Sequence, residues 1–203
     1  MIGRTIIDSI LRCRTYIFSI FLLYWISSAI GMVMVHTGND FALSSRDKII
    51  GEAHQTDPAA ISAQSGNAGS AVIRDWWENV IYAALPQTVA GLSIGIPYIS
   101  VACQGWVAGI VSVDDAHASR FRSITSTAYY FIVLFLQFVP FSLAIGAGIR
   151  CGVDTYRHNT QVSWKVWKYR MPAPSLKDLG IVFCTSLPLF LLASGFEFLS
   201  SWN

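Results

Sequence analysis

The chain has 203 residues, of which 53% are hydrophobic and only 13% are charged, and its mean hydropathy is +0.48. A soluble domain carries about 25% charged residues, so this composition excludes an ordinary soluble domain and predicts an all-α, polytopic integral membrane protein. The net charge of +2 is too small to indicate a nucleic-acid partner.

The first apolar run covers residues 15–35 and follows a short segment that contains Arg4, Arg12 and Arg14. It holds no charged residue, and its 21 positions are enough to cross a bilayer as a helix. A secretory signal peptide is the alternative, but such a peptide has a shorter apolar core and a cleavage motif close behind it. We therefore predict an uncleaved first transmembrane helix with its N-terminus in the cytoplasm.

Residues 37–78 form a polar segment that we place outside the membrane. Residues 41–54 have the rough helical spacing of apolar side chains that is typical of a helix lying on the membrane. Residues 57–71 are rich in small residues and predict a loop or a weak helix. Trp76 and Trp77 are typical of a headgroup-level aromatic belt.

Residues 79–113 form an uncharged stretch that is broken by Gly91, Gly95 and Pro97. Its 35 positions are far more than the roughly 20 that one crossing needs. We predict a helical hairpin with arms at 79–94 and 98–113 and a turn at residues 95–97. Lipid cannot hydrogen-bond the backbone of such a turn, so we expect other helices to surround the hairpin.

Two further uncharged runs predict transmembrane helices at 127–149 and 179–201. Pro140 is expected to kink the first of them, since a proline inside a helix frees a carbonyl group. Gly146 and Gly148 permit close approach of another helix.

The basic segment 150–178 separates these two runs. Its aromatic and cationic residues alternate in a pattern that favours an amphipathic helix on the anionic cytoplasmic leaflet. The residues expected to contact the membrane surface are Trp164, Lys165, Trp167, Lys168 and Arg170.

The distribution of cations favours five crossings. With residues 1–14 and 150–178 inside, the inner segments hold nine of the 14 Lys and Arg residues, and the longer outer segments hold the other five. A single long tilted helix at 79–113 would give four crossings and would put the two basic segments on opposite sides. We therefore predict a multi-pass protein of the cell membrane with its C-terminus outside.

Small residues and amides recur along the proposed hairpin and the helix that follows it. Gly91 and Gly95, like Gly105 and Gly109, are four residues apart and could form grooves for a second helix backbone. Gln87, Gln104 and Gln137 could hydrogen-bond between helices. These residues either hold the bundle together or line a path for a substrate or ion, and the first interpretation is the simpler one. The residues assigned to the hairpin and to helix packing are Asn79, Gly91, Gly95, Pro97, Gln104, Gly105, Gly109, Gln137, Pro140, Gly146 and Gly148.

Over about residues 75–152 the chain resembles the stage II sporulation protein M family of small membrane proteins. The resemblance rests on Asn79, the glycines around the turn, the pair Gln104-Gly105, Gln137 three residues before Pro140, and the glycine-rich end before Arg150. Gln104 stands where the family usually has Asn, and Gln137 where it has Glu. The resemblance implies a bacterial inner membrane and a link to cell-envelope remodelling complexes, in which such a protein holds peptidoglycan-degrading partners.

No catalytic, cofactor or metal motif is visible. His36, Asp40, Glu52, His54, Asp114, Asp115 and His117 lie in the outer segments, without a metal-ligand spacing such as H-E-x-x-H. Glu197 alone places an acidic residue within a proposed span, near its outer end.

The first hypothesis is therefore a non-catalytic scaffold or accessory subunit of a membrane complex, a homo- or hetero-oligomer whose partners are the lipid bilayer and other envelope proteins. The second is a channel or permease subunit built around the broken hairpin. A third is a structural subunit of an energy-transducing complex, for which no pigment or quinone motif is present.

Overall fold

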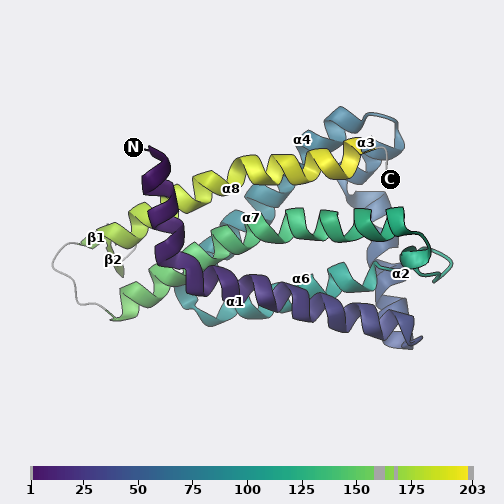
Figure 1. Cartoon of the computed structure of the whole chain (residues 1–203), viewed down its shortest axis with the longest axis horizontal. Helices are drawn as coiled ribbons and strands as arrows, with labels where there is room; N and C mark the ends of the chain where they lie inside the picture. Colours follow the sequence, from purple (N-terminus) through teal and green to yellow (C-terminus); the bar gives the residue numbers. More distant parts are fainter. Residues whose placement is uncertain (1, 158–162, 167–168, 201–203) are drawn as a thin grey trace.

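The computed structural model describes residues 2–157, 163–166 and 169–200, and it is all-α apart from one small sheet. Three long helices run along the molecule: α1 Ile2–His36, α7 Ile124–Arg157 and α8 Ala173–Leu199 (Figure 1). By length and composition, these three helices could each cross a membrane. Their apolar runs lie where the sequence predicted them, but each helix extends past the predicted span.

The most enclosed of the three long helices is α7. In its most apolar window 67% of residues are buried, against 28% in α1 and in α8. Aromatic rings join it to both neighbours: Tyr24 of α1 stacks on Phe138 at 4.5 Å between ring centroids, and Phe141 packs edge-on against Phe190 of α8 at 4.7 Å. The core therefore lies along α7.

The polar segment 37–78 folds into three helices rather than a loop: α2 Asp40–Thr56, α3 Pro58–Gln64 and α4 Ala68–Glu78. Each begins at a residue whose side-chain oxygen accepts a backbone N–H of the first turn, namely Asn39, Asp57 and Asn67. The sequence left a loop or a weak helix open at 57–71, and the structure has helix at residues 58–64 and 68–71, because these caps start a helix in spite of the small residues. Helix α2 lies across the end of the bundle (Figure 1).

The central stretch forms two arms, as predicted. The first arm continues α4 without a break through the π-helix η1 Asn79–Ala84, α5 Leu85–Ala90 and the 3₁₀ turn η2 Gly91–Ser93. The second arm is α6 Gly95–Ile110. Several side chains of the two arms are exposed, among them Tyr82 and Val89 of the first arm and Ile99 of the second. The expectation that other helices surround the hairpin is therefore wrong, because α7 takes the central position.

The segment 150–178 is not the amphipathic helix that the sequence suggested. Helix α7 continues to Arg157, β1 Ser163–Val166 pairs antiparallel with β2 Tyr169–Pro172, and α8 begins at Ala173. Alternating aromatic and cationic residues fit the two-residue period of a strand as well as a helix face, and the pattern did not distinguish them. A final short 3₁₀ turn, η3 Arg120–Arg122, lies between α6 and α7.

Candidate functional site

The hairpin turns at Ile94, one residue before the predicted turn. Ile94 has φ +60°, a left-handed conformation that is rare for a β-branched residue, and its N–H donates to the carbonyl of Gly91 at 2.9 Å. Gly95 and Pro97 are not the turn but belong to the first turn of α6, where a proline costs no helical hydrogen bond. Pro97 is fully buried there.

The second arm packs backbone to backbone on α1. A Cβ atom added to Gly105 would lie 2.8 Å from the carbonyl oxygen of Tyr24, and one added to Gly109 would overlap the carbonyl oxygen of Ser28. On the facing side, a Cβ on Gly31 would overlap the carbonyl oxygen of Trp106. Only glycine permits this close approach at these three positions.

The first arm packs in the same way on α7. A Cβ added to Gly91 would lie 2.5 Å from the carbonyl carbon of Gly148, and one on Gly148 would overlap the carbonyl oxygen of Thr88. Gly146 faces α1, where a Cβ would lie 2.6 Å from the backbone nitrogen of Ile17. A Cβ on Gly95 would meet nothing within 4 Å. The expectation that Gly91 and Gly95 share one groove is therefore wrong, because the helix breaks between them.

The amide side chains of the hairpin lie in different surroundings. Tyr24 donates its hydroxyl to Gln104 Oε1 at 2.6 Å, across the α1–α6 contact. Asn79 donates to Asp75 Oδ2 at 2.9 Å within the first arm. Gln87 is buried, and its Oε1 has no hydrogen-bond partner in the described part of the chain.

Pro140 is buried inside α7, and the helix continues through this residue.

A cavity of about 560 Å³ lies near the C-terminal end of α8, between α6, η3, α7 and α8. Gln137 and Glu197 line it together with Arg120 and Arg122, both exposed. Gln137 Nε2 donates to Glu197 Oε2 at 2.6 Å, and the hydroxyl of Tyr129 donates to the backbone carbonyl of Glu197 at 2.8 Å. The Glu197 carboxyl thus lies beside Gln137, which is ten positions after the start of the uncharged run 127–149. The carboxyl therefore lies farther from the end of the bundle than the position of Glu197, near the end of the predicted span 179–201, suggested.

No salt bridge to Glu197 is present in residues 2–157, 163–166 and 169–200. Asp75 of α4 is a separate carboxyl, which accepts a hydrogen bond from Asn79, and burial raises its pKa.

Polar residues of α2 and of the connector between α6 and α7 form a clamp. Arg46, whose side chain is only 3% exposed, pairs with Asp115 at 2.6 Å and with Asp47 at 3.1 Å. His117 Nε2 is 2.9 Å from Asp47 Oδ2. Hydrogen bonds with His117 and with Arg46 lower the pKa of Asp47. No group of three His, Cys, Asp or Glu side chains among the described residues could hold a metal ion. The clamp fixes α2 to the connector between α6 and α7.

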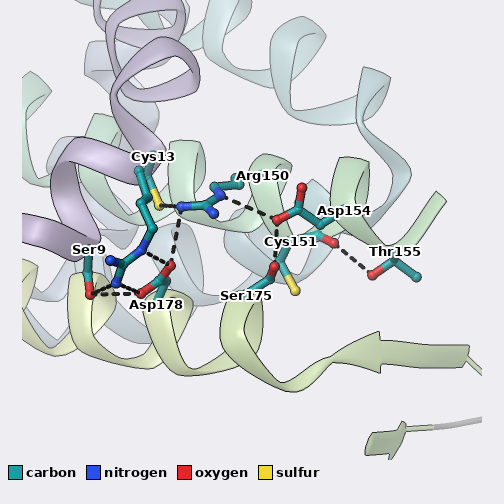
Figure 2. Close-up of polar contacts among 9 residues, drawn as sticks. Ser9, Cys13, Arg150, Cys151, Asp154, Thr155, Ser175 and Asp178 are labelled. Carbon is teal, nitrogen blue, oxygen red and sulfur yellow. Dashed lines mark hydrogen bonds and ion pairs between the residues drawn. The ribbon is translucent and has the colours of Figure 1, made fainter. Parts of the chain in front are cut away.

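An ion network joins α1, α7 and α8 at the opposite end (Figure 2). The Asp178 side chain, 4% exposed, accepts from Arg12 Nε at 2.7 Å, Arg150 Nη1 at 3.2 Å and Ser9 Oγ at 2.8 Å. Arg150 Nε also pairs with Asp154 Oδ2 at 3.3 Å, and Ser175 Oγ donates to the same oxygen. The sequence analysis missed this network, and the only available signal was the position of Arg150 and Asp178 at the ends of apolar runs.

Three of the five residues predicted to contact the membrane surface lie in the two-stranded sheet. Trp164 and Lys165 lie in β1, where they pair with Met171 and Arg170 of β2, respectively. Trp167 and Lys168 lie outside the described residues. The contact of these residues with a membrane stays a prediction.

The arrangement thus comprises a tightly packed hairpin, a cavity near the C-terminal end of α8 that contains the Glu197 carboxyl, and an ion network at the opposite end of the bundle. Compared with known proteins, the chain matches no family model, no curated protein and no solved structure.

Proposed function

We propose that this protein is a non-catalytic scaffold or accessory subunit of a larger membrane complex. The observation that carries the proposal is the packing of the hairpin, whose glycines touch the backbones of α1 and α7. Gln104 is bonded to Tyr24 instead of facing a channel. Such contacts between backbones suit a rigid framework, whereas a path for a substrate needs polar groups that face water.

The proposal includes five crossings. The second arm follows α1 over most of its apolar run, from a hydrogen bond of 2.9 Å between Tyr98 and Ser19 to a contact of 3.3 Å between Trp106 Nε1 and Met34 Sδ. Helix α6 has 16 residues, or about 24 Å, somewhat less than the roughly 30 Å of a hydrocarbon core. The first arm is continuous over residues 79–93, or about 22 Å. Both arms are therefore long enough to reach across most of a bilayer.

Labelling of single cysteines tests this topology. In a chain whose four native cysteines are replaced, Ser93→Cys and Ala116→Cys each put one thiol at an exposed position, the first at the hairpin turn and the second in the connector after α6. A membrane-impermeant maleimide added to intact cells should label Ala116→Cys, and it should label Ser93→Cys only after the membrane is opened. Labelling of both thiols from the same side would contradict five crossings, because only α6 separates the two positions.

The outer helices offer the surface for a partner. Ile61 of α3 and Ile73 of α4 are 43% and 57% exposed, on helices that lie outside the predicted spans. The resemblance to the sporulation protein M family suggests a partner that remodels the cell envelope. Such a partner would contact this outer surface, and the helix bundle would hold the partner at the membrane.

Purification from the native membrane in mild detergent tests the scaffold function. We expect a partner to remain bound in a fixed ratio through size-exclusion chromatography, and the double variant Ile61→Ser/Ile73→Ser to lose it. A variant with Leu192→Ser, a comparable change on an exposed position of a membrane-spanning helix, is the matched control and should keep the partner. A wild-type protein that runs as a monomer without any partner would contradict the proposal.

The Glu197 cavity supports a second candidate, a permease or channel subunit. A carboxyl group at this depth without a cationic partner is a typical feature of proton- or cation-coupled transport. Reconstitution of the purified chain alone into liposomes separates the two candidates. A proton or cation flux that Glu197→Gln abolishes would favour the permease, and tight liposomes would favour the scaffold.

A further inference from the structure

The Glu197 cavity, the space of about 560 Å³ between α6, η3, α7 and α8, has a volume typical of binding sites for small molecules. Its lining along α7 extends from Ser126 to Gln137, eleven positions later, or about 16 Å of helix. Glu197 lies at the Gln137 end, where the two side chains are hydrogen-bonded. The arginines of η3, which precedes α7, lie at the other end. The cavity thus carries an acidic group and basic groups at opposite ends.

The acidic end offers an acceptor without a cation. Gln137 Nε2 donates to Oε2 of Glu197, and no hydrogen bond to Oε1 is present among residues 2–157, 163–166 and 169–200. The same ranges hold no salt-bridge partner for this carboxyl. An ammonium group of a ligand would supply both a counter-charge and N–H donors.

The basic end offers donors. Arg120 and Arg122 are exposed, and neither guanidinium group forms a hydrogen bond or a salt bridge with the residues that the structure describes. Asp114 lies near both arginines and offsets one of the two charges, but its Oδ1 accepts two backbone N–H groups of the connector. Asp115 is paired with Arg46 of the clamp. The free guanidinium groups can therefore bind a carboxylate of a ligand through two parallel N–H···O bonds.

The middle of the cavity combines apolar side chains with hydroxyl groups. The apolar lining residues between the two ends are Ala108, Val111, Val133 and Leu134. The hydroxyl groups of Tyr129 and Tyr130 donate to backbone carbonyls, so their oxygens can accept N–H groups of a ligand. An extended peptide spans about 3.3–3.6 Å per residue. Four residues therefore approach the length of the lining.

We propose that this cavity binds a short extended peptide, with its terminal ammonium at Glu197 and its terminal carboxylate at Arg120 and Arg122. The charges at the two ends fix the direction of the peptide. A phospholipid headgroup does not span these ends, because its ammonium and phosphate groups are only a few atoms apart. The binding of a peptide goes beyond the proposed scaffold function, and it requires neither a protein partner nor transport.

Isothermal titration calorimetry of the detergent-solubilised full-length protein tests the proposal, with tetra-alanine as the probe. N-acetyl tetra-alanine lacks the ammonium group, and tetra-alanine amide lacks the carboxylate. We expect each blocked peptide to bind the wild-type protein about tenfold more weakly than tetra-alanine, the ratio expected for the loss of one hydrogen-bonded charge. This comparison needs no variant.

Two variants assign the ends of the peptide. Glu197→Gln should bind tetra-alanine and its acetylated form alike, and Arg120→Gln/Arg122→Gln should bind tetra-alanine and its amide alike. Glutamine at position 197 keeps a partner for Gln137, and both arginines are exposed and unpaired, so these variants should fold. Arg74→Gln removes an exposed cation of α4 outside the cavity. It is the matched control and should keep both preferences.

Three results would overturn the proposal in whole or in part. Equal binding of the free and blocked peptides, or no binding of any of them, would show that there is no such site. Loss of the preferences in Arg74→Gln as well would show general charge attraction. A preference that depends on Glu197 alone would leave a site for an amine instead of a peptide. The assay measures binding in detergent, so a missing protein partner or tight liposomes would contradict other proposals and not this one.

Discussion

Gly109→Ala is expected to lower the free energy of unfolding by about 2–3 kcal/mol, the upper part of the range for an overpacked contact. The new methyl group would overlap the carbonyl oxygen of Ser28 and lie 2.9 Å from the backbone nitrogen of Met32. Both contacts are to backbone atoms, so no flexible side chain can move aside. Helices α1 and α6 would have to separate, and this would weaken the contact along much of their length.

Gly95→Ala is the matched control because it makes the same chemical change in the same helix. A Cβ at Gly95 meets nothing within 4 Å. We expect its free energy of unfolding to stay within about 0.5 kcal/mol of the wild-type value. Reversible unfolding in mixed micelles, followed by tryptophan fluorescence, measures both variants. Equal stability of the two would show that the glycine contact between α1 and α6 does not hold the hairpin.

The sequence located the long helices well but not their ends. Apolar runs mark the part of a helix that faces lipid or core, and hydropathy therefore found the middle of α1, α7 and α8. Charged residues outside the membrane can continue the same helix, as they do before residue 15 in α1 and after residue 149 in α7. Hydropathy carries no information on that continuation, whereas side-chain caps such as Asn39 and Asp57 do.

The position of the hairpin in the bundle could not be predicted for a different reason. Uncharged runs at 79–113 and 127–149 look alike in composition, but only α7 is surrounded by neighbours. Burial within a membrane protein depends on packing between helices, and lipid-facing and core-facing apolar residues are chemically similar. The glycines were the right residues to examine. The sequence could not show, however, that Gly91 faces α7 while Gly95 faces no other residue.

The polar sites show the same limit. Gln137 and Glu197 lie 60 positions apart, and Arg12 and Asp178 lie 166 apart. Spacing motifs detect partners within one element, but these pairs form only when two helices pack. An acidic residue near the end of a predicted span was visible in both cases, at Asp178 and Glu197. That feature is the one sequence signal that pointed to either site.

Asp178→Asn is expected to cost about 3 kcal/mol of stability, at the lower end of the range for breaking a buried ion pair. The Asp178 side chain is 4% exposed and is the common partner of Arg12 and Arg150, whose side chains are 49% and 17% exposed. The asparagine keeps the volume but removes the charge, so Arg150 keeps only Asp154 as counter-ion. The exposed part of Arg12 can regain water, and this limits the loss.

Glu52→Gln provides the matched control, since it removes the carboxylate of a surface ion pair. Glu52 lies 4.0 Å from Lys48, and the side chains of Lys48 and Glu52 are 76% and 66% exposed. We expect a change below about 0.5 kcal/mol for this surface pair. Thermal unfolding in detergent measures both variants, and equal effects would show that the inner network does not stabilise the bundle.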